Sequence, residues 1–348
     1  MPQDQRPSGS FGSLVLIAGV VVACAAAFAW TAGWLTPGRV TPEQFVAAFA
    51  PAGGPALGYR RNHAKGICFS GEFTANGAGT ALSKARVFVA GRYPVIGRFN
   101  LGGADPHMAD ATGRVRGLGI RISTPDGREW RSAMIDVPFF PVATPQAFYQ
   151  LLTLDSRDPK AGPAFAAAHP EFGVFGAWAA SAPWTASYVE ERYNSIDSFV
   201  FVDAQGTQRA VRWSYLPAAQ PVPVAAADLA KLGPDFLEQD LLRRAAAGPL
   251  RFNLVVTVAA ADDPTADPSK AWPAQRQSVD VGTLTVEQVQ AERDGACRDI
   301  VFDPTVLPDG IRTSDDPFPA ARAAVYARSY DKRTAETAYY RQATEKAP

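Results

Sequence analysis

Residues 85–124 read ARVFVAGRYPVIGRFNLGGADPHMADATGRVRGLGIRIST. Three short runs in this stretch, ARVFV at 85–89, VIGRF at 95–99 and GIRI at 119–122, are rich in β-branched and aromatic residues. Glycine, proline and aspartate separate the runs, and this alternation is typical of consecutive β-strands joined by turns. The same pattern extends over residues 66–142, so the sequence predicts a sheet built from this region.

More strands and several helices are predicted on either side of this region. Further β-branched and aromatic runs occupy residues 199–202, 211–215 and 252–258. Helical patterns begin at Thr41-Pro42, fill much of 145–194 and 225–247, and return from 317 onward. Many short strands with helices between them predict an α+β fold, in which a closed antiparallel β-barrel carries helical insertions.

The overall composition narrows the possible functions. The chain has 348 residues with 34 Lys+Arg and 34 Asp+Glu, so the formal net charge is zero. Because there is no excess of basic residues, we expect no nucleic-acid partner. The chain has only three histidines, His63, His107 and His169, and this small number argues against a multi-histidine metal site.

The N-terminus contains a long uncharged run. Residues 11–35 read FGSLVLIAGVVVACAAAFAWTAGWL, and about 20 apolar residues suffice for a helix to span a membrane. We therefore expect a tail at 1–10, a transmembrane anchor at 11–35 and a body at 36–348 outside the cytoplasm. A cleaved signal peptide and lipidation at Cys24 are the alternatives, and the length of the run favours the uncleaved anchor.

The other two cysteines are Cys68 and Cys297, and their spacing matches no zinc pattern. An oxidising compartment would permit a disulfide between them. The sequence leaves open whether the two thiols meet, because their separation along the chain says nothing of their distance in the fold.

A polar stripe is predicted on the C-terminal helix. Asp316-Pro317 is a typical helix start, and Arg322, Tyr326, Ser329 and Arg333 follow at positions i, i+4, i+7 and i+11 on one face. A guanidinium one turn from a phenol favours the charged phenolate, which is a suitable ligand for ferric iron. The alternative is an exposed helix that carries scattered arginine and tyrosine residues.

A histidine precedes the first predicted strand, in the segment YRRNHAKG at 59–66. His63 could move protons, because the pKa of histidine lies near neutrality. The alternative is a surface histidine or a hydrogen-bonded histidine in the core.

Taken together, these segments resemble the haem catalase family, and more closely its short catalase-related peroxidases. The resemblance covers roughly residues 45 to 340 and rests on an ordered set of short motifs. These are Arg60-x-x-His63-Ala64-Lys65-Gly66, Arg98-Phe99, Arg116-Gly117, Trp272-Pro273, Val281-Gly282-x-Leu284, Phe302-Asp303-Pro304, Pro308-x-Gly310-Ile311 and Arg322-x-x-x-Tyr326.

The resemblance implies a role for each predicted site residue. Tyr326 would be the axial iron ligand and Arg322 would stabilise its phenolate, with Ser329 in register on the same helix. His63 would be the acid–base residue above the haem. Arg60, Arg98 and Arg333 would pair with the haem propionates, and Phe148 would help wall the distal side.

Two positions depart from the family pattern. Asn100 stands where the family has a serine behind the histidine, and Asp136 best matches the family's distal asparagine. An ionised Asp136 could only accept hydrogen bonds, and its charge would raise the pKa of His63. The chain is also shorter than a full catalase, which implies a more open pocket.

The resemblance implies a catalase-like barrel whose C-terminal helix carries the haem ligand, with haem b as the cofactor. The expected function is reduction of organic peroxides and hydrogen peroxide by a small external reductant, with weak catalase activity. A fatty-acid hydroperoxide isomerase of the same fold and a non-catalytic haem-binding protein are the alternatives. We expect a monomer or a dimer, attached to the membrane through the N-terminal helix.

Overall fold

The computed structural model describes residues 10–31, 39–51 and 53–345. The chain divides into two compact units, Met1–Thr41 and Pro42–Pro348. The second unit contains all ten strands, and every strand pair is antiparallel.

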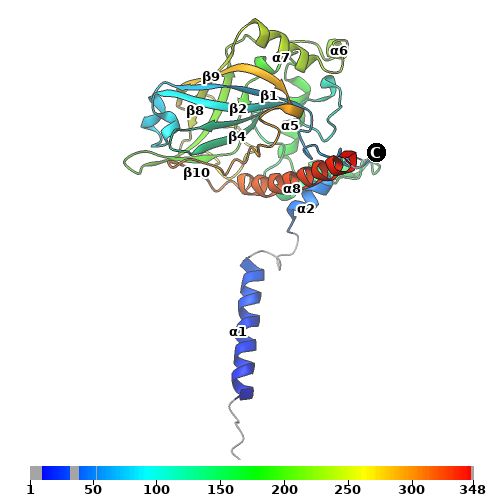
Figure 1. Cartoon of the computed structure of the whole chain (residues 1–348), viewed down its shortest axis with the longest axis vertical. Helices are drawn as coiled ribbons and strands as arrows, with labels where there is room; N and C mark the ends of the chain where they lie inside the picture. The colour runs from blue at the N-terminus through cyan, green and yellow to red at the C-terminus, as the bar shows by residue number, and fades with distance from the viewer. Residues whose placement is uncertain (1–9, 32–38, 52, 346–348) are drawn as a thin grey trace, which may run out of the picture. The chain divides into compact units, whose positions relative to one another are not determined.

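Eight of these strands close into a barrel, as the sequence predicted (Figure 1). The order is β7-β5-β4-β3-β2-β1-β9-β8, and the pairing of β8 with β7 closes the ring, while β6 and β10 extend from β7. The strands are β1 (Gly66–Ala75), β2 (Gly91–Leu101), β3 (Arg116–Ser123), β4 (Glu129–Ile135), β5 (Tyr193–Asn194), β6 (Phe199–Val202), β7 (Gln208–Pro217), β8 (Leu250–Val258), β9 (Ser278–Ala291) and β10 (Ile311–Thr313).

Helices connect and flank the strands in the regions predicted to be helical. They are α2 (Pro42–Ala48), α3 (Pro145–Leu152), α4 (Ala161–Ala168), α5 (Glu171–Ser181), α6 (Ala226–Leu229), α7 (Phe236–Ala247) and α8 (Phe318–Glu345). At the start of α8 the Asp316 carboxylate accepts a hydrogen bond from the Phe318 N–H at 2.9 Å, which satisfies a free donor of the first turn. Figure 1 shows α8 beside the barrel, and α2 packs against it.

One predicted strand is wrong. Residues 85–89 form a 3₁₀ turn (Arg86–Phe88) instead, and its Val87 and Phe88 side chains are fully buried. The Phe88 ring packs edge-on against Trp130, with centroids 5.5 Å apart, inside the main apolar core. Residues in the core are apolar whether they form a strand or a turn. A buried turn therefore has the same residue types as a strand, and the sequence pattern cannot distinguish the two.

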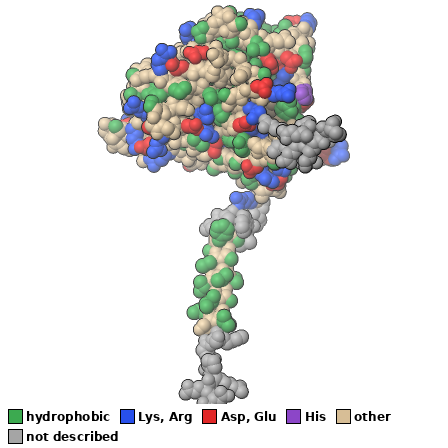
Figure 2. Space-filling model, in the orientation of Figure 1, with side chains coloured by type: hydrophobic (Ala, Val, Ile, Leu, Met, Phe, Trp, Pro, Cys, Tyr) green, Lys and Arg blue, Asp and Glu red, His purple; other side chains and the backbone are tan. Residues whose placement is uncertain are grey.

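The first unit contains α1 (Ser10–Thr31). Among the described residues it is the one helix long and apolar enough to cross a membrane, over Gly12–Trp30. Figure 2 shows apolar side chains along it, without the basic and acidic side chains that are scattered over the body. A signal sequence near the N-terminus can also contain such a helix. Residues 32–35 of the predicted anchor lie outside the described residues.

Cys68 and Cys297 form a disulfide, with their Cα atoms 5.4 Å apart. It joins β1 to the segment that follows β9, across 229 residues of sequence. Gly295 allows this close approach, because a Cβ atom there would lie 2.5 Å from the Cys68 sulfur. The question that the sequence left open is answered by the tertiary structure, which brings the two distant cysteines together.

Replacing both cysteines by alanine should lower the free energy of unfolding by about 2–5 kcal/mol, because the unfolded chain gains the freedom that the cross-link removes. Urea denaturation of the double variant against wild type measures this difference. Cys24→Ala is the matched control, since Cys24 is an exposed free cysteine in α1. Equal midpoints for the double variant and the control would show that the disulfide does not stabilise the body.

Candidate active site

A cavity of about 630 Å³ is lined by the barrel strands β2, β3 and β4, the loop before β1, and helices α2, α3 and α8. It brings together nine of the ten site residues predicted from the sequence. These are Arg60, His63, Arg98, Asn100, Phe148, Arg322, Tyr326, Ser329 and Arg333. The tenth, Asp136, is not among the lining residues.

Helix α8 presents the predicted polar stripe to the cavity. Arg322 donates to the Tyr326 hydroxyl oxygen from Nε at 3.2 Å and from Nη2 at 3.1 Å. Its other donors bind the carboxylate of Asp197 and the Ala133 carbonyl oxygen of β4. The guanidinium is therefore fixed from three directions, with its positive charge directed at the phenol oxygen.

His63 is held by its own loop. The side-chain oxygen of Asn62 accepts from the His63 N–H at 2.9 Å and from the Gly103 N–H at 3.1 Å. The Ser329 hydroxyl accepts from the Arg61 N–H at 3.2 Å, which joins this loop to α8. Two structural elements far apart in sequence thus meet at the cavity through a hydrogen bond from a main-chain N–H to a side-chain hydroxyl.

Backbone strain is concentrated at the cavity. His63 (φ 53°) and Ile196 (φ 54°) are the non-glycine residues with positive φ in the described parts of the chain, and both line the cavity. Such left-handed conformations cost about 1–2 kcal/mol for residues with a Cβ atom, and β-branched residues rarely adopt them. The strain at Ile196 lies next to Asp197, the partner of Arg322, and the strain at His63 is at the predicted acid–base residue.

The His63 ring has a defined tautomer. Its Nδ1 lies 2.6 Å from the side-chain oxygen of Asn100, which can only accept, so Nδ1 carries the proton and Nε2 is free to accept one. Gly117 leaves space for the Asn100 side chain, because a Cβ atom at residue 117 would lie 2.2 Å from that oxygen. The asparagine therefore supports the ring in the position where the sequence comparison expected a serine.

Burial, together with the charges of Arg98, Arg322 and Arg60, lowers the pKa of His63 to about 4, against the hydrogen bond to Asn100, which raises it. The expectation that an acidic neighbour raises this pKa is wrong, because the charges that face the ring are guanidiniums. The imidazole is neutral at pH 7 and can accept a proton.

Asp136 lies behind the cavity wall. Ile135 and Val137 line the cavity, whereas the side chain of Asp136 between them does not. Its carboxylate accepts from the Arg116 N–H at 3.0 Å, and burial raises the pKa of Asp136 to about 7. The predicted place of Asp136 beside the substrate is therefore corrected, because its carboxylate binds the Arg116 N–H and the apolar Ile135 and Val137 line the cavity instead.

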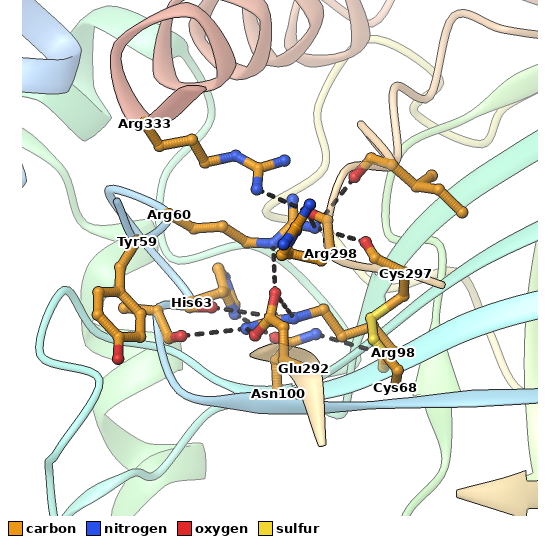
Figure 3. Close-up of polar contacts among 12 residues, drawn as sticks. Tyr59, Arg60, His63, Cys68, Arg98, Asn100, Glu292, Cys297, Arg298 and Arg333 are labelled. Carbon is orange, nitrogen blue, oxygen red and sulfur yellow. Dashed lines mark hydrogen bonds and ion pairs between the residues drawn. A yellow bond between two sulfur atoms is a disulfide. The ribbon is translucent and has the colours of Figure 1, made fainter. Parts of the chain in front are cut away.

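Three arginines gather around one carboxylate at the edge of the cavity (Figure 3). Arg60 and Arg98 both bind Glu292, and Arg333 lies beside them with 4% of its surface exposed. Arg98 donates four of the five guanidinium hydrogens to Glu292 and to main-chain oxygens. Arg333 Nη2, in contrast, is buried and has no hydrogen-bond partner among the described residues.

Two contacts at this site were missed from the sequence. Asp197 and Glu292 each bind the guanidinium of a predicted site residue, at Arg322 and Arg98 respectively. Neither acidic residue belongs to a periodic pattern, since Asp197 lies between two short strands and Glu292 follows the end of β9. No local signal distinguishes them from the chain's other acidic residues.

Comparison with known proteins identifies the family. The family model described as "Catalase" matches residues 56–344. The chain is 35% identical to a catalase-related peroxidase of Synechococcus elongatus over 311 residues, covering 87% of this chain and 91% of that protein. It is 33% identical to a catalase-related peroxidase of Mycolicibacterium paratuberculosis over 301 residues, covering 85% and 96%.

Solved catalase structures share the fold. A fungal catalase superposes with a TM-score of 0.71 at 20% identity, and a bacterial catalase with 0.70 at 21% identity. In each case 80% of this chain is covered, whereas the chain spans 60% of the fungal enzyme and 58% of the bacterial one. The matched family region and the two relatives over most of its length show that this chain belongs to the catalase family of haem-dependent oxidoreductases that act on peroxides.

Proposed function

We propose that this protein is a haem b peroxidase that reduces organic peroxides with a small external reductant. The observation that carries the proposal is the pairing of Arg322 with the Tyr326 hydroxyl in the same cavity as a neutral, oriented His63. The pair offers a tyrosine oxygen, a ligand that haem iron takes, and the histidine offers a base.

The residues at the cavity fit haem b in charge and in hydrogen bonding. Three guanidiniums and the Glu292 carboxylate leave a net charge of +2, which the two propionates of haem b would neutralise. A buried donor without a partner costs about 1–3 kcal/mol, and a propionate oxygen would satisfy Arg333 Nη2. Arg60, with a pKa that burial lowers to about 9, stays charged at neutral pH.

Haem bound here would supply the electrons that reduce the O–O bond, and the protein would move the proton. His63 Nε2 takes the proton from the incoming hydroperoxide and returns it to the departing oxygen as water or alcohol. Asn100 keeps the ring in the tautomer that this requires, because its oxygen retains the Nδ1 proton. Arg322 keeps the Tyr326 oxygen in place through its two hydrogen bonds.

The cavity wall supports the proposed preference for organic peroxides. Phe148, Phe175, Ile135 and Val137 line it with apolar surface. An alkyl group gains free energy against such a wall, whereas a second hydrogen peroxide molecule gains little from it. Phe148, predicted as a wall residue, packs with Phe140 at a centroid distance of 4.9 Å, which makes this part of the wall an aromatic cluster.

We expect kcat/KM for tert-butyl hydroperoxide to exceed that for hydrogen peroxide by about 10–100-fold, since each buried CH₂ contributes about 0.8 kcal/mol. Oxidation of a reducing dye measures both substrates, and an oxygen electrode measures catalase activity in the same haem-replete sample. Rapid oxygen release without dye oxidation would contradict the proposal. Consumption of the alkyl hydroperoxide without dye oxidation would indicate an isomerase, and no consumption would indicate a haem-binding protein.

We further propose that α1 anchors the protein in a membrane with the body outside the cytoplasm. The apolar segment Gly12–Trp30 and the disulfide Cys68–Cys297 support this independently, because structural disulfides persist in oxidising compartments.

Added protease should therefore digest the body in spheroplasts, and the protein should sediment with membranes. A variant without residues 1–35 is the control and should remain in the cytosol, protected from the protease. Full-length protein that is soluble in the cytosol would refute the anchor. Intact body released into the periplasm would show cleavage of the N-terminal segment.

A further inference from the structure

Glu292 is the acidic residue at the centre of the arginine cluster. Its Oε1 accepts from Arg60 Nε at 3.2 Å and from Arg98 Nε at 2.9 Å, and its Oε2 accepts from Arg98 Nη2 at 2.6 Å (Figure 3). Burial alone would raise the pKa of Glu292, but the charges of Arg98 and Arg60 outweigh burial and hold the pKa below its ordinary value. The side chain is therefore an ionised carboxylate shared by two guanidiniums.

Arg98 also binds the main chain of the predicted acid–base residue, His63. Its Nη1 donates to the main-chain oxygen of His63 at 2.9 Å, and its Nη2 donates to that of Ala64 at 3.1 Å. These carbonyl groups belong to His63 itself and to the next residue, so they lie in the turn where His63 has its positive φ, a conformation that residues with a Cβ atom disfavour. Gly66 leaves space for the guanidinium, because a Cβ atom there would lie 2.5 Å from its central carbon.

The segment that carries Glu292 is itself fixed. The carbonyl oxygens of Cys297, Arg298 and Ile300 accept from Arg60 Nη2 at 3.1, 3.2 and 3.0 Å. The Arg298 carbonyl also accepts from Arg333 Nη1 at 2.6 Å. The disulfide ties Cys297 to Cys68 in β1, two residues after Gly66. Residues 292–300 are therefore held in place by hydrogen bonds from Arg60 and Arg333 and by the disulfide to β1.

We infer that Glu292 is a positioning residue for peroxide reduction: it holds Arg98, and through Arg98 it fixes the turn that presents His63 to the cavity. The same carboxylate keeps Arg60 beside Arg98 despite their like charges. Glu292 does not line the cavity, so it acts through these arginines and not on the substrate. The inference rests on the proposed role of His63 as the proton acceptor.

Glu292→Gln tests the inference with almost no change in size. The amide would place an N–H₂ group against one of the guanidiniums. The cluster would lose its negative charge, so its net charge would rise by one. We expect peroxide reduction by the full-length holoprotein to slow by about 10–100-fold, as for other lost supports of a reacting group. Glu287→Gln is the matched control, because Glu287 is an exposed residue five positions earlier, on β9.

A second readout separates positioning from general stability. The charges facing His63 are Arg98, Arg322 and Arg60, and loss of the Glu292 charge leaves them less balanced. The acid limb of the pH–rate profile should therefore move to lower pH in Glu292→Gln, with no shift in Glu287→Gln. Glu292→Asp keeps the charge, so its acid limb should stay near the wild-type position, and this variant serves as the test if Glu292→Gln does not fold.

Wild-type rate and an unshifted acid limb in Glu292→Gln would overturn the inference while leaving the proposed function intact. A slow variant whose acid limb stays in place, and whose rate loss follows its loss of thermal stability, would show a merely structural role and also overturn it. If the wild-type protein itself bound no haem or failed to react with peroxide, the proposed function would fail first.

Discussion

Tyr326→Phe should weaken haem binding at least about 100-fold, because loss of supporting contacts alone typically costs 10–100-fold and here the ligand oxygen itself is removed. The phenyl ring has no atom that can bind iron. Arg322 would keep its contacts with Asp197 and with the Ala133 carbonyl, so α8 should stay folded against the barrel. The absorption spectrum of the purified protein, after titration with haem, measures the retained cofactor.

Tyr330→Phe is the matched control for this variant. Tyr330 also lines the cavity from α8, and its ring lies 4.9 Å from the Arg333 guanidinium, a contact that phenylalanine can keep. We expect the control to bind haem as the wild type does. Wild-type haem content and spectrum in Tyr326→Phe would remove Tyr326 from the role of iron ligand.

His63→Ala should retain haem but react with peroxide about 10²–10⁴-fold more slowly, the usual contribution of a positioned general acid–base group. No other histidine lines the cavity within the described residues. Stopped-flow measurement of the first spectral change after mixing with peroxide gives the rate. His107→Ala is the control, since His107 packs edge to face against Tyr59, with ring centroids 6.0 Å apart, and is not among the cavity residues.

The pH dependence adds an independent check on His63. Because burial lowers its pKa to about 4, the base form persists above that pH, and the wild-type rate should fall only as the pH drops through about 4. His63→Ala should lack this limb. An unchanged rate in the variant, or the same acid limb without the histidine, would show that another group moves the proton.

Much of the fold follows from patterns that are local in sequence. Strands β6, β7 and β8 overlap the runs predicted at 199–202, 211–215 and 252–258, because short β-branched segments between turn residues have few other stable arrangements. The strand predicted at residues 85–89 is wrong, because burial in the core requires apolar residues whether the backbone is a strand or a 3₁₀ turn.

The helical stripe could also be predicted, for a geometric reason. Residues four apart lie on the same face of a helix, so Arg322 and Tyr326 were expected to meet, and the structure places their polar atoms 3.1 Å apart. The placement of Asp136 failed because the residues on either side of it line the cavity and it does not, and a resemblance between sequences cannot be aligned to the accuracy of one residue.

The sequence by itself thus determined the barrel class, the uncharged N-terminal segment and the Arg322–Tyr326 pair, because each depends on residues close together along the chain. Only the tertiary structure decided the disulfide Cys68–Cys297, the low pKa of His63 and the sharing of Glu292 between Arg60 and Arg98. Each of these depends on the distance between groups that are remote in sequence, and on burial away from water. Those quantities exist only once the barrel has closed and α8 has packed beside it.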